Sequence, residues 1–327
     1  MLEPFLAMLD PMLTLFTIIA IGFTLRKLNI LPDSAGKAMA KLETWVFCPA
    51  LSFLSMVRCC TLETMSTHAT NLFLSIFVIV IAIPIGIVLA RLFVKTKCDE
   101  RGIFCYALVF ANSGYMGDPL ILSLMGDAAL AYYKFFCVPV SVGILTWGVS
   151  MLIPKGEKKG DTLKAIFNPP MVALFLGIFA GLLGFGKVLP ALMESTLQNL
   201  MNCMGPVAML LAGFTIAGYK TLEIVGDKKV YIASVLRMTL IPAVLIGSVF
   251  GVKELVNLIF NLNIDNTVLY LTFFAYATPL GMNTIVYPEA YGGNPKTGAS
   301  MALISHTLAV LVIPLTYSLM NVIFGSV

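Results

Sequence analysis

Two short segments concentrate residues that can bind a small polar solute within an otherwise apolar chain. The first reads F-A-N-S-G-Y-M-G-D-P-L from Phe110 to Leu120, and the second reads A-T-P-L-G-M-N-T from Ala277 to Thr284. Asparagine, serine and threonine side chains form hydrogen bonds without carrying charge. Glycine and proline interrupt helices and leave backbone N–H and C=O groups free to bind something else.

The rest of the chain is suited to a membrane. Of its 327 residues, 59% are hydrophobic and 12% are charged, whereas an average soluble protein has about 45–50% apolar and about 25% charged residues. This composition excludes a soluble fold. Because the sequence has no basic patch with interleaved aromatic residues on a soluble module, we expect no nucleic-acid partner.

Apolar runs bounded by charged residues, glycine or proline predict ten membrane-spanning helices, since one span needs about 20 residues. A polar linker at 155–166 divides the chain into a first five-helix repeat, 1–154, and a second, 167–327. The predicted fold is an all-α polytopic membrane protein. Its spans are 9–28, 40–57, 71–94, 103–125, 129–153, 167–185, 197–219, 230–252, 267–287 and 297–324.

Proline spacing indicates that the two halves are copies of one unit. Four prolines recur in order at offsets of 157 to 160 residues. Because each half has an odd number of spans, the second copy enters the membrane upside down, which is the inverted repeat of many secondary transporters. The four pairs are Pro32 and Pro190, Pro49 and Pro206, Pro84 and Pro242, and Pro119 and Pro279.

Positive charge predicts the orientation of the chain. Sixteen of the 21 Lys and Arg residues fall in the odd-numbered connections, four fall in the even-numbered connections, and Arg237 lies inside a span. Cytoplasmic loops carry the excess of Lys and Arg. We therefore expect a multi-pass protein of the plasma membrane with both termini outside.

The two polar segments occupy spans four and nine, which are equivalent positions in the two repeats. At about 1.5 Å per residue, Asn112 lies about 14 Å into its span and Pro279 about 18 Å into its own. Both depths are near the middle of a hydrocarbon core about 30 Å thick. Broken helices that cross there would point half-helix N-termini at one place, which favours an anion such as a carboxylate.

Ionisable residues inside spans are costly and are often functional. Asp118 adjoins the break in span four, where it could bind a proton or cation, or could cap a half-helix. His306 could act as a proton-linked switch or as a hydrogen-bonded packing residue. Arg237 is expected to extend to the cytoplasmic face, and Lys134 to lie at the membrane interface.

No arrangement of residues favours an intramembrane enzyme. The metalloprotease string H-E-x-x-H and the nucleotide-binding string G-x-x-x-x-G-K-[ST] do not occur. Ser300 and His306 lie about 240° apart around one helix, so they cannot form a dyad. Seven cysteines without C-x-x-C spacing predict neither disulfides nor a metal site. We expect no cofactor; an anion channel is the main alternative to a carrier.

The same motifs resemble those of the auxin efflux carrier family, the plant PIN-type carriers and their bacterial relatives, along nearly the whole chain. N-S-G-Y-M-G-D-P-L at Asn112 is similar to the family's fourth-helix motif, and A-T-P-L-G at Ala277 to its ninth-helix motif. C-P-A-L-S-F at Cys48 and N-P-P at Asn168 match further family patterns.

This resemblance implies broken crossover helices four and nine, an elevator-type movement and a homodimer. It implies that Asn112 and Ser52 contact the substrate carboxylate and that Pro119 and Pro279 form the crossover. Bacterial relatives are associated with small organic acids such as malonate and malate. The expected function is therefore export or exchange of a small organic anion. The expected substrate-binding residues are Ser52, Asn112, Ser113, Gly114, Gly117, Pro119, Pro279, Gly281, Asn283 and Thr284, with Asp118 and His306 as possible coupling residues.

Overall fold

The computed structural model describes residues 2–67, 69–96, 98–154, 167–260 and 264–325. Over these residues the chain is helical, and its extended backbone pairs at one isolated antiparallel bridge between Ala111 and Leu280. The predicted all-α class is thus confirmed. The predicted linker at 155–166 lies outside the described residues.

The helices follow the apolar runs of the sequence. In the first half they are α1 (Leu2–Lys27), α2 (Ala35–Leu42), the π-helix η1 (Glu43–Phe47), α3 (Cys48–Cys59), α4 (Leu62–Thr67), α5 (Ala69–Phe93), α6 (Asp99–Val109), the π-helix η2 (Ser113–Gly117), α7 (Asp118–Phe136), α8 (Val138–Gly143), the π-helix η3 (Ile144–Gly148) and α9 (Val149–Leu152). In the second half they are α11 (Pro169–Leu182), the 3₁₀-helix η4 (Phe185–Lys187), α12 (Ala191–Ala217), α13 (Thr221–Val225), α14 (Lys228–Met238), α15 (Leu240–Phe260), α16 (Thr267–Tyr276), α17 (Asn283–Tyr291) and α18 (Lys296–Phe324).

The predicted spans coincide with single helices or with consecutive ones. Among the described residues, five helical stretches are long and apolar enough to cross a membrane, and a sixth candidate is bent by 43° between Phe136 and Val138. The sequence analysis did not predict this bend, which lies beside Pro139, a residue that cannot donate a helical hydrogen bond. The other predicted spans are shorter or broken, so the ten-span topology stays a prediction.

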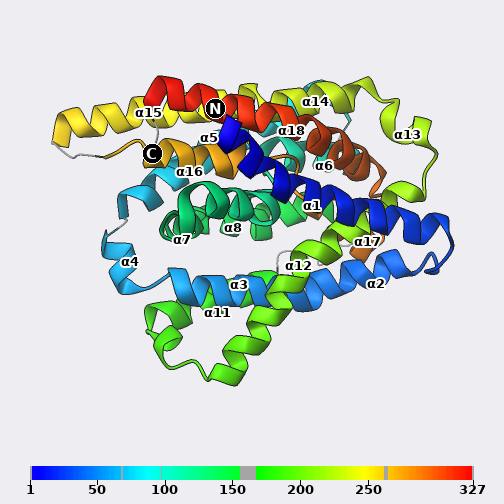
Figure 1. The fold of residues 1–327 in the computed structure, drawn as a ribbon, viewed down its shortest axis with the longest axis horizontal. Coiled ribbons are helices and arrows are strands. Elements are labelled where there is room, and N and C mark those ends of the chain that lie inside the picture. Colours follow the sequence, from blue (N-terminus) through cyan, green and yellow to red (C-terminus); the bar gives the residue numbers. More distant parts are fainter. Residues whose placement is uncertain (1, 68, 97, 155–166, 261–263, 326–327) are drawn as a thin grey trace.

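Helices from the two halves of the chain pack directly on each other. α1 lies along α12, and α3 lies along α11 (Figure 1). A Cβ atom at Gly22 would collide with the backbone carbonyl of Leu210, and one at Gly213 with that of Ile19. Between apolar helices in lipid, such close approach supplies the van der Waals packing that holds them together. The halves are therefore interleaved and do not form separate lobes.

The remaining long helices form a second group, in which α5 packs on α6 and α15, and α14 packs on α15 and α18. Figure 1 shows α2, α3 and α11 on one side of the molecule, α14, α15 and α18 on the opposite side, and α7 and α8 between them. The two broken segments are held within this arrangement, because α16 contacts both η2 and α7.

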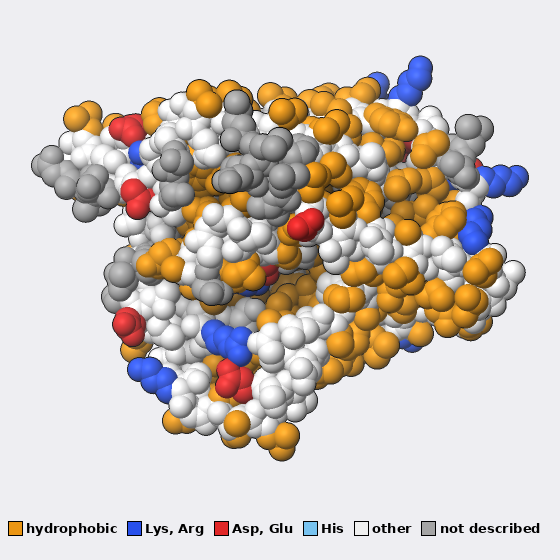
Figure 2. Space-filling view, viewed as in Figure 1, with side chains coloured by type: hydrophobic (Ala, Val, Ile, Leu, Met, Phe, Trp, Pro, Cys, Tyr) orange, Lys and Arg blue, Asp and Glu red, His pale blue; other side chains and the backbone are white. Residues whose placement is uncertain are grey.

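The surface is that of a protein surrounded by lipid. Figure 2 shows hydrophobic side chains over much of one face, and large residues such as Leu92 and Leu258 are more than two-thirds exposed, at 71% and 79%. Exposed apolar area on this scale marks a membrane or protein interface. In the same view, Lys and Arg side chains lie at the right-hand end and also at the upper and lower left, and both chain termini lie toward the left.

Candidate substrate site

The two broken segments meet through their backbones. The N–H of Asn112 donates to the carbonyl of Pro279 at 2.7 Å, next to the bridge between Ala111 and Leu280. The N–H of Leu280 in turn donates to the hydroxyl of Ser305 at 3.2 Å. Each interrupted helix thus finds partners for backbone groups that hydrocarbon could not satisfy.

Local sequence explains where each helix breaks. α6 ends at Val109, and Phe110 is extended before η2 begins at Ser113. Gly117 allows close approach of α7 and α16, because a Cβ there would collide with the hydroxyl of Tyr133 and lie 3.2 Å from the carbonyl of Phe274. Pro279 lies in the break between α16 and α17 and lacks the N–H that a continuous helix would require, whereas Pro119 lies in the first turn of α7, where a proline is tolerated.

Asn112 is the central polar side chain of this crossing. It is buried, and its Nδ2 lies 3.1 Å from Nε2 of His306. Nδ1 of His306 lies 2.8 Å from the carbonyl of Ala302, so Nδ1 carries the proton and Nε2 accepts from Asn112. This tautomer fixes the orientation of the asparagine amide, whose Oδ1 has no hydrogen-bond partner among the described residues.

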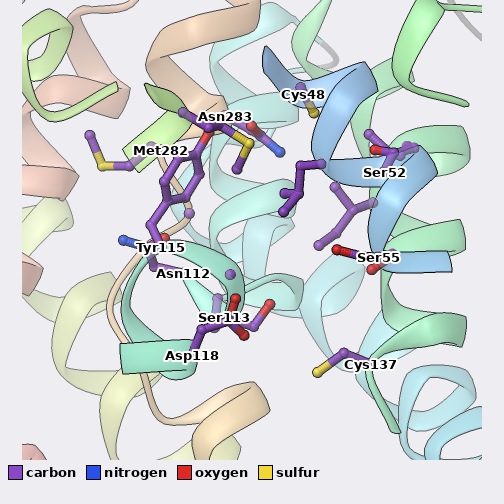
Figure 3. A pocket seen from close by; sticks show the side chains of 18 of the residues that line it. Cys48, Ser52, Ser55, Asn112, Ser113, Tyr115, Asp118, Cys137, Met282 and Asn283 are labelled. Atoms are coloured by element: carbon purple, nitrogen blue, oxygen red, sulfur yellow. The ribbon is translucent and has the colours of Figure 1, made fainter. Parts of the chain in front are cut away.

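A cavity of about 110 Å³ adjoins the crossing. It is of the same order as a cavity of about 150 Å³ that holds benzene in another protein, so it suits a small molecule. In Figure 3, Asn112, Ser113 and Asp118 face it from one side, and Ser52 and Ser55 of α3 from the other. Figure 2 shows a hollow between the region of α7 and α8 and that of α3.

The structure brings most of the predicted site residues together. Ser113, Gly114 and Gly281 contribute to the lining with little or no side chain, so their backbone groups approach the cavity closely. Gly117, Pro119, Pro279, Thr284 and His306 are not among the lining residues. The lining includes Ser52, Asn112, Ser113, Gly114, Asp118, Gly281 and Asn283, together with Ser55, Tyr106, Tyr115, Tyr133, Lys134 and Ser141, which the sequence analysis did not propose.

The polar residues of the second segment have different surroundings. Asn283 lines the cavity and donates from Nδ2 to the hydroxyl of Tyr106 at 2.8 Å. Thr284 is fully buried, and its hydroxyl donates to the carbonyl of Gly281 at 3.1 Å. Thr284 thus stabilises the start of α17, whereas Asn283 presents polar atoms to the cavity.

Lys134 lies in the wall of the cavity, a position that the sequence analysis did not predict. Its Nζ forms an ion pair with Asp118, and both residues line the cavity with side chains that are about one-fifth exposed, at 23% and 21%. The reason is that α7 turns at Gly126, where φ is 80°, and runs back past the crossing. The predicted end of span four at 125 and start of span five at 129 agree with this reversal, but they did not reveal that it brings Lys134 next to Asp118.

Arg237 does not extend to the cytoplasmic face, and that prediction is wrong. Its side chain is 2% exposed, because α14 packs on α18 and α6 at this position. The sequence analysis placed it at a depth from which a long side chain can reach water, but the direction of the side chain depends on tertiary packing.

A further buried carboxylate, Glu43, was missed by the sequence analysis. It is fully buried at the start of η1 and lies near Tyr115, a lining residue of the cavity. The available signal was an acidic residue placed three positions into an apolar run. Within the described residues, no cluster of His, Cys, Asp or Glu is arranged to hold a metal ion.

Comparison with known proteins agrees with this architecture. The model of the family described as "Membrane transport protein" matches the chain twice, over residues 7–162 and 159–317. An uncharacterized transporter of Methanocaldococcus jannaschii is 23% identical over 94% of this chain and 97% of its own length. A protein of Rhizobium meliloti named "Putative malonate transporter" is 26% identical over 63% of this chain and 65% of its own length.

These relatives are transporters and not enzymes, which fits a chain with many apolar helices and a polar cavity at their centre. The small-molecule substrate and the multi-pass membrane location follow from the same comparison. With two matches that together span residues 7–317, the chain belongs to the membrane transport protein family, the auxin-efflux-carrier-like family indicated by its motifs.

Proposed function

We propose that this transporter is a secondary carrier that exports or exchanges a small organic anion, a carboxylate such as malonate or malate. The observation that supports this most is the position of Asn112, which is held by His306 beside a small cavity at the crossing of two broken helices. The cavity volume favours a molecule with few heavy atoms. The relative named for malonate, at 26% identity, points to the same class of substrate.

Recognition of the carboxylate would rely on neutral groups. Asp118 and Lys134 offset each other's charge in the cavity, so the remaining donors are amides, hydroxyls and backbone N–H groups. The first N–H groups of a helix have no partner within it, and this applies at the start of η2, where Met116 is the first residue whose N–H donates to Asn112. At the start of α17, the N–H groups of Thr284 and Ile285 already donate to the carbonyls of Gly281 and Met282. We assign contact with substrate to Asn112, Ser113 and Ser52, and to Gly114, Gly281 and Asn283; Gly117, Pro119, Pro279 and Thr284 would shape the crossing.

For the topology, we propose ten spans in two inverted repeats, with both termini outside the plasma membrane. The double match of the family model supports two repeats, and the excess of Lys and Arg in the odd-numbered connections supports the orientation. Alternating access by an elevator-type movement would use the two helix groups, one containing α1, α3, α11 and α12 and the other containing α5, α14, α15 and α18. The homodimer rests on the family resemblance.

Coupling to protons would involve Asp118 or His306. A proton added at Nε2 of His306 would oppose the amide hydrogens of Asn112 and force the amide to turn over. At Asp118, protonation would release Lys134 from its ion pair. Either event would change the polar groups that face the cavity.

The proposed function is tested with purified protein in liposomes loaded with malonate. We expect saturable uptake of labelled malonate that unlabelled malonate and malate inhibit and that a bulky aromatic acid does not. A channel would instead give unitary currents far above the turnover of a carrier. Absence of competition among small dicarboxylates would contradict the proposed substrate class.

Replacing Asn112 with alanine should remove the central recognition group. A hydrogen bond to a charged partner contributes about 1.5–3 kcal/mol, so we expect an affinity for malonate that is roughly 10- to 100-fold weaker, with normal insertion. Asn202→Ala is the matched control, because Asn202 is an exposed asparagine on α12. Wild-type transport by Asn112→Ala would refute the role of Asn112.

The ion pair in the cavity is tested by a double-mutant cycle. Breaking a buried pair by removing one partner costs about 3–5 kcal/mol, and partial exposure here reduces that value. We expect Asp118→Asn and Lys134→Gln each to lower the melting temperature, and the double variant to recover part of the loss. If Asp118 couples protons, Asp118→Asn will also lose dependence of transport on a pH gradient. Strictly additive melting-temperature losses would show that the pair is not an interacting unit.

The proposed orientation is tested with Cys98, an exposed cysteine immediately before α6. In a Cys203→Ser background, which removes the other exposed cysteine among the described residues, a membrane-impermeant maleimide should label inside-out vesicles and not intact cells. Cys98→Ser should abolish that labelling. Labelling of intact cells at Cys98 would reverse the predicted topology.

A further inference from the structure

Arg237 is a buried cation that forms no hydrogen bond with the described residues. Its side chain is 2% exposed, and Nε, Nη1 and Nη2 all lack a hydrogen-bond partner among the described residues. A guanidinium group carries five N–H donors and no acceptor. Among the ion pairs in the described part of the chain, all five join other residues.

The guanidinium lies beside a small, partly polar cavity. The cavity volume is about 10 Å³, which is the space needed by one water-sized particle. The hydroxyl of Ser234 is buried there without a hydrogen-bond partner among the described residues. Ser305 also contributes, but its hydroxyl already accepts the N–H of Leu280. The lining residues are Ala107, Ala233, Ser234, Arg237, Leu280, Met301 and Ser305.

A second buried donor belongs to the same environment. The hydroxyl of Tyr276 has no hydrogen-bond partner among the described residues, and it lies close enough to Arg237 to interact with it electrostatically. Tyr106 is the other group that interacts electrostatically with the guanidinium. Within the described part of the chain, the surroundings of Arg237 therefore offer hydroxyl groups, and no ion pair with a carboxylate offsets its charge.

An isolated charge in a low-dielectric interior is costly unless it is paired. A water molecule could accept one hydrogen bond from Arg237 but would leave the positive charge uncompensated. A small anion would accept from the guanidinium and from Ser234 and would also offset the charge. Donors are in excess at this position, which is the composition of an anion site and not of a cation site.

We propose that this cavity binds a monatomic inorganic anion such as chloride, with Arg237 as its principal ligand and Ser234 as a second donor. Because chloride is larger than water, the flexible side chain of Met301 in the lining would move aside to admit it. The site is separate from the substrate cavity, although the two lie on either side of one stretch of backbone. Leu280 lines the anion cavity, and the next residue, Gly281, lines the substrate cavity. Chloride bound at Arg237 would thus stabilise the crossing from the side opposite the substrate cavity.

The test measures the melting temperature of the detergent-purified protein in mixtures of sodium chloride and sodium gluconate at constant ionic strength. A ligand that binds only the folded state stabilises it in a concentration-dependent manner. We expect a saturable rise of a few degrees with chloride, which Arg237→Met should abolish. Arg58→Met is the matched control, because Arg58 is an exposed arginine paired with Glu194, and this variant should keep the chloride response.

Two results would overturn the proposal: equal melting temperatures in chloride and gluconate, or an unchanged chloride response in Arg237→Met. If Arg237→Met does not fold, crystals of the unaltered protein grown in bromide decide the matter by anomalous scattering. A bromide peak beside Arg237 supports the site, and a map without a peak there contradicts it. Neither measurement depends on transport, so failure of the proposed carrier function would leave this test intact.

Discussion

The hydrogen bond from the Asn112 N–H to the Pro279 carbonyl is the interaction on which the rest of the architecture depends. Two helices are interrupted within an apolar protein, and each interruption frees backbone groups that lipid cannot satisfy. The two segments pair these backbone groups with each other, because the bridge between Ala111 and Leu280 lies beside that bond. This pairing requires that α6 and α16 end at the same depth and that the segments after them run antiparallel.

This requirement explains why the two halves of the chain are interleaved. A half with its own broken helix and no partner would leave polar backbone groups exposed to lipid. The close packing of α1 on α12, which requires glycine at Gly22 and Gly213, fastens the first half to the second on the outside of the molecule. The crossing fastens them on the inside. The stability of the fold and the existence of the polar cavity therefore have one cause.

The positions of the two helix breaks at the site were predictable from the sequence. The breaks could be placed because glycine and proline act on their own backbone, and Asn112, Ser52 and Asn283 do face one cavity. The spacing of prolines indicated two related halves, and the family model does match the chain twice. These features need only neighbouring residues or a simple repeat.

The surroundings of individual side chains were less predictable. The position of a residue along a helix gives its depth in the membrane but not the direction in which its side chain points. Lys134 was assigned to an interface from its place near the end of a span, and its ion pair with Asp118 in the cavity was not predicted. Arg237 was assigned to water, although α6 and α18 cover it. Glu43 was overlooked near a helix start. The sequence thus indicated where the polar backbone would lie, whereas the partners of the buried charges required the tertiary structure.

The two cavities differ in charge, so an anion bound in one would affect the binding of an anion in the other. The proposed substrate cavity contains an ion pair with no net charge, whereas the cavity on the other side of Leu280 and Gly281 contains a cation without a hydrogen-bond partner among the described residues. A substrate anion would be attracted by Arg237 across the thin backbone segment that includes Leu280 and Gly281, because screening is weak in a buried site. Chloride beside Arg237 would cancel that attraction while stabilising the crossing. Because coupling between two binding sites is reciprocal, a bound substrate would weaken chloride binding by the same factor, so the proposed anion site would oppose substrate binding while it supports the fold.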